Sequence, residues 1–392
     1  MTPISFATIY NQDIMNILMF VCNPFTNDPR VYNEARSLIQ AGHRVTVIAW
    51  DRERQNPARQ IWDGIEVMRL RIWLSPRYGL GTPPWHAFHL LVWQFQAYRQ
   101  ALALHRETGF NVIHCHDLDA LPIGVKLKQK LGLPLVYDAH EIYGYMAAGV
   151  ASGWVGSILL QLEKWLIKKT DRIITVSEVL KKYFNGITDK PISVIMNCKP
   201  LQSLEYQSPD SHNIFTLVYI GLLDKTRTLF QLIHVSGKLS DVACVIGGIG
   251  KPSYVQAVKE ECAKRRNITF LDRVPFEEVL SITKKADVVF CMFDPADHLS
   301  KIGMPNKLFE AMVCGRPIIC TKGTYSGELA EREEIGLAIE YNEAALKQAI
   351  IKLRDNPELR ERLSRNALRA ALNKYNWQNQ EKKLLELYWS FQ

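Results

Sequence analysis

Short apolar runs alternate with stretches of helical spacing along most of the chain. The first run, residues 16–22, is followed by helical spacing at 30–41 and by a second apolar run at 45–49. Asp28 and Pro29 predict the start of the helix, because aspartate accepts free backbone amides and proline fits the first helical turn. Strand, helix and strand in this short span predict a parallel βαβ unit.

The same alternation continues into the second half and predicts two α/β domains. Helices are expected at 84–106, from Ser177 onward and over 343–391. Further strands are expected at 67–72, 112–116, 134–138, 172–176 and 192–196, and then at 215–220, 242–246, 268–271, 288–292 and 317–320. This pattern predicts mainly parallel sheets with helices on both faces, which bind ligands beyond the carboxyl ends of their strands.

A polar stretch without periodicity, residues 198–212, separates the two series and predicts a linker. The expected fold class is α/β, with two Rossmann-like doubly wound domains that face each other across a cleft. These domains are expected at 1–200 and 201–370, with a C-terminal helix at 371–392 that crosses back to the first domain. The glycine-rich segment 247–251 lacks the spacing of a Walker loop and is interpreted as a flexible turn in the cleft wall.

Composition narrows the class of protein. The chain has 392 residues, of which 47% are hydrophobic and 22% charged, as in ordinary globular proteins. Its net charge of +8 lies mostly in residues 1–200, where 22 Lys and Arg stand against 16 Asp and Glu. Basic residues are scattered, without a basic helix or an aromatic RNA motif, so we expect no nucleic-acid partner.

The cysteines and the N-terminal residues indicate the cellular compartment of the protein. The eight cysteines form no CxxC pair and several stand in apolar runs, which predicts free core thiols in a reducing compartment, the cytoplasm. Residues 1–13 lack the regions of a signal peptide, and Met15 is an alternative start to Met1. No run of about 18 apolar residues predicts a membrane-spanning helix.

The segment 303–319 carries the strongest indication of chemistry. It predicts a loop that enters a helix near Asn306, with Lys307 in the first turn and Glu310 one turn further on. A helix N-terminus binds anions, a lysine adds positive charge, and a carboxylate can accept hydrogen bonds from a ribose diol. From these residues alone, a solvated helix with a surface Glu–Lys pair explains the segment equally well.

At this point the sequence resembles the family four retaining glycosyltransferases, which have the GT-B fold. Residues 305–312 and 314–317 are similar to the nucleotide-binding segment of that family, and Gly221 with Arg227 six positions on is similar to its glycine strand end. Similar motifs stand in the family's order over nearly the whole chain: Asp28 to Val31, Ala41 to Val47, Val112 to Asp117, Asp138 to Glu141 and Ile174 to Ser177. Each motif is weak alone, and together they are specific for the family.

The resemblance implies roles in the second domain. The donor-binding residues would be Gly221, Arg227, Pro305, Asn306, Lys307 and Glu310. Glu310 would bind the ribose, while Arg227 and Lys307 would be catalytic because they stabilise the departing diphosphate. For Arg227 the alternative is a surface arginine on the following helix.

Two positions depart from the family pattern. Ile302 stands eight residues before Glu310, where the family often has a glutamate, and Leu222 stands where a phosphate-binding arginine is common. Lys307 would supply the missing charge. The recognition of the donor sugar is left open by Ile302.

In the first domain the candidates follow two strands. His116 would be the third catalytic residue, binding or polarising near the transferred sugar or acceptor; a buried structural histidine is the alternative. We expect His114 and His116 to face different sides of the sheet. The acceptor-binding or sugar-binding candidates are Asp117, Asp138, His140 and Glu141. A metal site is disfavoured, because Arg227 and Lys307 already balance the charge of the leaving group, so no cofactor and no essential metal are expected.

Two aromatic and apolar stretches, from Trp73 to Tyr98 and over residues 143–160, are each followed by basic residues. Both are consistent with domain core. The sharper hypothesis is peripheral contact with the inner face of a membrane that carries a lipid-linked acceptor.

The resemblance therefore implies a retaining, hexosyltransferase-type enzyme of polysaccharide biosynthesis. It would move a sugar from a nucleoside diphosphate sugar, held by the second domain, to a glycan or lipid-linked acceptor held by the first. Two alternatives stay open. One is a sugar-nucleotide epimerase, and the other is a non-catalytic binding subunit, which the departures at Ile302 and Leu222 would suit.

Overall fold

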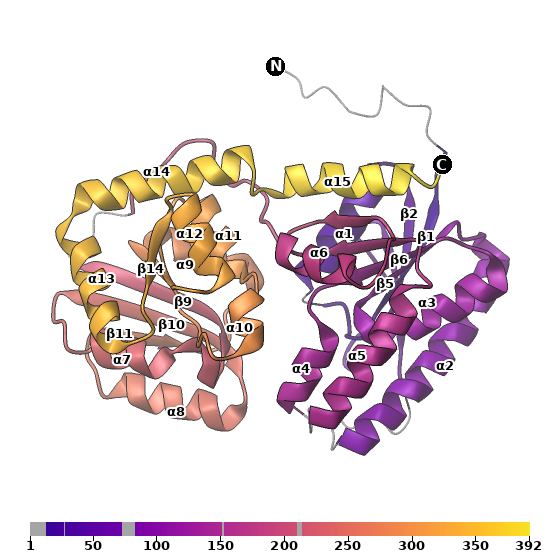
Figure 1. The fold of residues 1–392 in the computed structure, drawn as a ribbon, viewed down its shortest axis with the longest axis horizontal. Coiled ribbons are helices and arrows are strands. Elements are labelled where there is room, and N and C mark those ends of the chain that lie inside the picture. Colours follow the sequence, from indigo (N-terminus) through magenta and orange to yellow (C-terminus); the bar gives the residue numbers. More distant parts are fainter. Residues whose placement is uncertain (1–12, 27, 73–82, 151–152, 210–213) are drawn as a thin grey trace. The chain divides into compact units, whose positions relative to one another are not determined.

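The computed structural model describes residues 13–26, 28–72, 83–150, 153–209 and 214–392. The N-terminal leader and the aromatic residues Trp73 and Tyr78 lie outside this part of the chain. The chain forms two compact units, one of Met1–Met196 with Glu381–Gln392 and one of Asn197–Gln380 (Figure 1).

The first unit is built on a sheet with the order β3-β4-β2-β1-β5-β6-β7-β8. Its strands are β1 (Asn16–Val21), β2 (Arg44–Trp50), β3 (Arg59–Trp62), β4 (Ile65–Leu70), β5 (Val112–His116), β6 (Leu135–Ala139), β7 (Arg172–Thr175) and β8 (Ile192–Val194). Its helices are α1 (Pro29–Gln40), α2 (Pro83–Thr108), α3 (Asp117–Leu131), α4 (Tyr143–Val150), α5 (Gly153–Ile167) and α6 (Glu178–Asn185).

Helix α1 forms where the sequence predicts it. The Asp28 carboxylate accepts a hydrogen bond from the Val31 amide at 3.2 Å, and Pro29 occupies the first turn. The strand order reverses at β1, which pairs with β2 on one side and β5 on the other. Because such crossovers are right-handed, the reversal places α1 and α3 on opposite faces of the sheet. This is the expected doubly wound arrangement.

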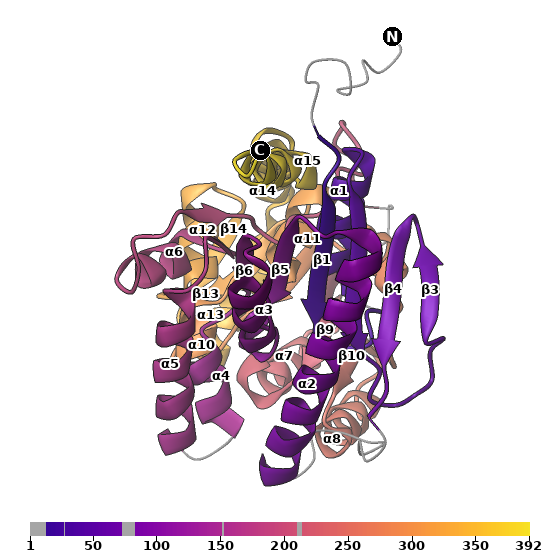
Figure 2. The same ribbon diagram turned by 90° about the vertical axis from the view of Figure 1, so that its right-hand side faces the viewer.

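A β-hairpin at the edge of this sheet was not predicted. Strand β3 pairs antiparallel with β4, and Figure 2 shows the two strands side by side at that edge. Asp63 and Gly64 connect them with positive φ angles of 48° and 83°. An Asp-Gly pair between two strand-like segments is a strong signal for a β-hairpin. Asp63 and Gly64 carry this signal in the sequence, and it would have predicted the hairpin.

The second unit has a parallel sheet with the order β11-β10-β9-β12-β13-β14. Its strands are β9 (Phe215–Leu223), β10 (Val242–Gly250), β11 (Ile268–Leu271), β12 (Val288–Cys291), β13 (Ile318–Thr321) and β14 (Gly336–Ile339). Its helices are η2 (Lys225–Arg227), α7 (Leu229–Ser236), α8 (Pro252–Ala263), α9 (Phe276–Lys285), α10 (His298–Ile302), α11 (Asn306–Cys314), α12 (Tyr325–Arg332), α13 (Glu343–Asp355) and α14 (Pro357–Asn373). The two sheets confirm the expected α/β fold class.

The interpretation of residues 247–251 as a turn is wrong. Strand β10 continues to Gly250 and stays in register with β9, so that Gly248 pairs with Gly221 and Gly250 with Leu223. A Cβ atom at Gly248 would overlap the carbonyl of Gly221, and one at Gly250 would overlap that of Leu223. These glycines therefore permit a close approach of two strands rather than a flexible loop.

The last helix, α15 (Trp377–Trp389), begins in the second unit, and residues Glu381–Gln392 group with the first. Within the first unit, the Tyr388 hydroxyl lies 2.7 Å from His114 Nδ1. The Lys383 ammonium donates to the Val194 carbonyl at 3.3 Å, and the Gln392 amide donates to the carbonyl of Asp13 at 2.8 Å.

The cysteines and the lengths of the helices can be compared with the expectations from the sequence. All eight cysteines are free thiols, and seven of them are buried. In the part of the chain that the structure describes, no helix has both the length and the apolar character needed to cross a membrane.

Candidate functional site

The candidate residues gather in two groups, one in each unit, at the carboxyl ends of the strands beside each reversal of strand order. In the second unit the reversal lies at β9, which pairs with β10 and β12. Gly221 stands near the end of β9 with a φ of 152°. A side chain at Gly221 would overlap the Lys307 ammonium, so only glycine leaves that space free.

Lys307 reaches this point from the first turn of α11, as the sequence predicts. Its ammonium lies 4.0 Å from the centroid of the Tyr219 ring and forms no ion pair with the described residues. Burial lowers the pKa of Lys307, and the positive charges of Arg227 and Lys199 act in the same direction. Pro305 caps the helix without a side-chain hydrogen bond and Asn306 is exposed, so the helix N-terminus is open to an anion.

Arg227 ends η2, the short helix after β9. Asp224 fixes this turn, because its Oδ1 accepts hydrogen bonds from the Thr226 amide at 3.0 Å and the Thr226 hydroxyl at 2.9 Å. The Arg227 guanidinium lies 4.4 Å from the centroid of the Phe293 ring, and its Nε is buried without a hydrogen-bond partner. Among the described residues it has no carboxylate partner.

Glu310 lies one turn further along α11 and is buried. Its Oε1 forms an ion pair with the Lys199 ammonium at 3.3 Å. The two positions that depart from the family pattern lie nearby in the chain: Ile302 ends α10 and is half-buried, while Leu222 is 48% exposed on β9.

The second group lies in the first unit, where β5 and β6 end. His116 and Asp138 stand opposite each other in register. One carboxylate oxygen of Asp138, Oδ2, lies 3.1 Å from His116 Nδ1 and 2.9 Å from His140 Nε2. The other ring nitrogen of His140 lies 3.1 Å from Asp117. Glu141 is exposed beside this group.

Two residues of α1 complete the second group and were not predicted as site residues. The Arg30 guanidinium donates to both oxygens of Asp138, at 2.8 and 2.6 Å, and to the Ile195 carbonyl at 2.8 Å. Its Nη2 also lies 3.2 Å from Glu34 Oε1. Arg30 and Glu34 lie one turn apart on the apolar face of α1, and charged residues on that face were the signal that could have indicated them.

The expectation that His114 and His116 face different sides of the sheet is wrong. Residues two apart in a strand share a face, and the two rings stack with centroids 4.3 Å apart. His114 is held by Tyr388, and its Nε2 lies 3.7 Å from Glu34. His116 is buried, so the structure places it inside this group of polar residues rather than on an open surface.

Charges within the second group are strongly coupled. Burial opposes ionisation of Asp138, but Arg30 and His140 outweigh it and hold its pKa well below the usual range. Burial would lower the pKa of His140, yet Asp117 and Asp138 raise it well above the usual value. Burial and the charge of Asp138 raise the pKa of Glu34 to about 8, so at neutral pH this carboxyl is mostly protonated.

Ligand atoms of Glu34, His114, His116 and Asp138 lie within 4.8 Å of one another, which is close enough for a metal ion. However, Arg30 already occupies both oxygens of Asp138 and pairs with Glu34. A second cation here would be repelled by the guanidinium. These residues therefore fit a divalent metal poorly.

Comparisons with known proteins indicate the family and the fold. The model of the glycosyl transferase 4-like domain matches residues 28–198, and that of glycosyl transferases group 1 matches residues 206–370. An uncharacterised glycosyltransferase of Methanocaldococcus jannaschii is 21% identical over 379 residues, which cover 90% of this chain and 91% of that protein.

Solved structures show the same fold. Sucrose-phosphate synthase from Thermosynechococcus elongatus superposes with a TM-score of 0.78 at 17% identity, over 96% of this chain and 98% of that chain. HepE of Anabaena, in complex with UDP and glucose, gives a TM-score of 0.70 at 16% identity, over 96% of this chain and 100% of that chain.

The two family models follow one another along the chain and together span most of it. Two doubly wound units with the strand orders described above are the GT-B fold of these solved neighbours. The chain belongs to the group 1 glycosyltransferases.

Proposed function

We propose that this protein transfers a sugar from a nucleoside diphosphate sugar to a hydroxyl acceptor, with retention of the anomeric configuration. The observation that carries the proposal is the pair of cations beside Gly221. Arg227 and Lys307 lie where the strand order reverses, and neither has a carboxylate partner among the described residues. Two such cations suit a diphosphate, and HepE of Anabaena has been solved with UDP in the same fold.

In the proposed reaction, the bond between the anomeric carbon and the β-phosphate oxygen breaks while the acceptor oxygen bonds to that carbon, and the acceptor proton passes to the departing diphosphate. Negative charge builds on the departing diphosphate. Arg227 and Lys307 would stabilise this charge, and the N-terminus of α11 would add its amides. Because these groups already supply positive charge, we propose that no metal is essential and that chelation with EDTA leaves the activity unchanged.

Glu310 would hold the ribose through its second carboxylate oxygen, since Oε1 is already paired with Lys199. The test is thermal stability against a panel of UDP, ADP, GDP and their sugars. A ligand far above its dissociation constant should raise stability by about 3 kcal/mol. The expected result is a shift with one nucleotide that Glu310→Ala reduces strongly.

The control for this panel is Glu331→Ala, which removes an exposed glutamate of α12 in the same unit. It should keep the full nucleotide shift. No shift with any nucleotide would favour a non-catalytic subunit. Conversion of the nucleotide sugar without an acceptor would favour an epimerase.

We further propose that the acceptor is lipid-linked and that the first unit contacts an anionic membrane surface. Large apolar side chains are exposed on two helices: Phe88, Leu91 and Phe95 on α2, and Trp154, Ile158 and Trp165 on α5. Helix α3 packs against both α2 and α5. The Lys169 ammonium lies 3.4 Å from the centroid of the Trp165 ring, which places a positive charge at this apolar surface.

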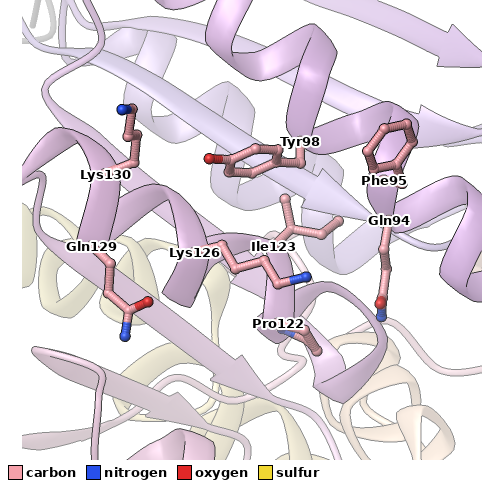
Figure 3. A pocket seen from close by; sticks show the side chains of 8 residues that line it. All are labelled: Gln94, Phe95, Tyr98, Pro122, Ile123, Lys126, Gln129 and Lys130. Atoms are coloured by element: carbon pink, nitrogen blue, oxygen red, sulfur yellow. The ribbon is translucent and has the colours of Figure 1, made fainter.

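A groove of about 470 Å³ lies along α2 and α3 (Figure 3). Phe95, Tyr98 and Ile123 give it apolar walls, and the ammonium groups of Lys126 and Lys130 border it. This combination suits an amphiphile with an anionic group.

Flotation with vesicles that contain anionic phospholipid tests the membrane contact. Binding should weaken as salt is added, and Trp154→Ser with Ile158→Ser should abolish it. Ile61→Ser is the matched control, because Ile61 is 78% exposed on β3 in the same unit. Equal binding by all three proteins would refute this surface.

A further inference from the structure

Lys199 is a buried lysine that the proposed reaction does not yet use. Only 4% of its side chain is exposed, and two groups of the described residues lie in contact with its ammonium. These are Glu310 Oε1 at 3.3 Å and the Phe276 ring, whose centroid lies 4.8 Å away. A lysine this buried is rare unless it is paired, and here its partner is the proposed ribose ligand.

The backbone of Lys199 is fixed as well. Its carbonyl accepts a hydrogen bond from the Trp377 amide at 3.0 Å, and the residue forms an isolated parallel bridge with Asn376. Asn376 is itself buried, and its side-chain amide donates to the Ala371 carbonyl at 2.7 Å. The ammonium therefore reaches Glu310 from a backbone that is held by Asn376 and by Trp377, the first residue of α15.

We infer that Lys199 is a positioning residue for the donor, which holds the Glu310 carboxylate so that Oε2 accepts from the ribose. This inference rests on the proposed function of Glu310. A carboxylate whose one oxygen is fixed by a buried ammonium has fewer orientations open to it, so its other oxygen is held in place for a diol. Oε2 is not paired with any described residue, so the ion pair leaves one oxygen for the ligand.

Lys199 is then a third cation at the proposed donor site. Arg227 and Lys307 face the diphosphate in the proposed mechanism, and Lys199 balances the one acidic residue among them. Without Lys199, Glu310 would compete with the diphosphate for Lys307, whose charge it already influences. Removing Lys199 should therefore weaken donor binding more than it slows turnover.

The experiment is a double-mutant cycle with Lys199→Met, Glu310→Gln and the double variant. UDP, ADP and GDP are titrated calorimetrically, and the donor KM and kcat are measured with the nucleotide sugar that binds. Each single variant should weaken nucleotide binding about tenfold, the loss of one charge-assisted hydrogen bond. The double variant should bind no more weakly than Glu310→Gln, and Lys199→Arg should restore most of the affinity.

Lys374→Met is the matched control, because Lys374 forms an ion pair with Glu333 at 3.1 Å in the same unit. It should bind nucleotide as the wild type does. A rise in donor KM with little change in kcat separates positioning from a general loss of structure, and thermal unfolding without nucleotide shows whether Lys199→Met is folded.

The remaining outcomes overturn the inference in distinguishable ways. If Lys199→Met binds normally while Glu310→Gln does not, Lys199 has no role and the proposed function stands. If the two losses add in the double variant, Lys199 acts on the nucleotide directly rather than through Glu310. If Glu310→Gln binds normally, the ribose assignment fails and the role of Lys199 fails with it.

Discussion

The two groups of candidate residues balance their charges in opposite ways. In the first unit, Arg30 and His140 face the carboxylates of Asp138 and Asp117, and Glu34 is mostly protonated. In the second unit, Arg227 and Lys307 have no carboxylate partner among the described residues. The first group is neutralised by its own members, whereas the second carries a surplus of positive charge.

This difference indicates two kinds of site. Lys307 is buried and Arg227 half-buried, and neither forms an ion pair with a described carboxylate, so this group suits the diphosphate of the proposed donor. A network that is already neutral has a fixed geometry and little attraction for a charged ligand. The first group is therefore suited to orienting neutral hydroxyl groups of a sugar or an acceptor.

The largest expected effect comes from breaking the neutral group. Asp138→Asn leaves Arg30 buried without its ionised partner, and loss of one member of a buried pair costs about 3 kcal/mol or more. For a unit of this size the unfolding midpoint should fall by roughly 10 °C in differential scanning calorimetry. Asp189→Asn, an exposed aspartate of the same unit, should leave the midpoint unchanged. A midpoint unaltered by Asp138→Asn would show that the network contributes little.

Removal of one surplus cation should affect catalysis rather than stability. Arg227→Ala should lower kcat by about 100-fold to 1,000-fold, as for other groups that stabilise transition-state charge. The midpoint of unfolding should stay about the same, because the half-buried Arg227 guanidinium forms no ion pair with the described residues that its removal would break. Lys225→Ala is the control, since Lys225 is exposed in the same short helix. Equal kinetics for both variants would contradict the assignment of Arg227.

A smaller effect tests the protonation of Glu34. Its pKa in the folded protein, about 8, lies above the value of about 4.3 in an unfolded chain. The folded state then binds this proton more tightly, so the contribution of Glu34 to stability falls as pH rises from about 4.3 through about 8. Glu34→Gln removes the titration, so its stability relative to the wild type should increase by about 2 kcal/mol between pH 6 and 8. Unfolding midpoints measured across this range would show it, and a constant difference would refute it.

The fold was predictable from the sequence because its signals are local. The apolar run of β1, the cap of α1 at Asp28 and the glycine after α11 each act within a few residues. Segment 247–251 was wrongly predicted as a turn. Its glycines allow close pairing with β9, about 27 residues away in the chain, and this contact exists only in the paired sheet.

The candidate sites were predictable only in part, because some of their residues meet through contacts between distant parts of the chain. Glu310 and Lys307 stand in one recognisable segment, and their placement on α11 follows from it. Lys199 lies 111 residues from Glu310 and meets it only in the folded unit. Arg30 likewise reaches Asp138 across 108 residues. Pairs this distant carry no periodic signal, so a single sequence does not show them.

The return of residues Glu381–Gln392 to the first unit has a consequence for biosynthesis. When residue 196 leaves the ribosome, the partner of His114 has not been made, because Tyr388 is encoded near the other end of the message. At ordinary rates of translation, the intervening residues take about 10 to 40 seconds to synthesise. During that delay the nascent first unit exposes the surface that Leu384 and Tyr388 later bury, which makes it a client for chaperones on the ribosome.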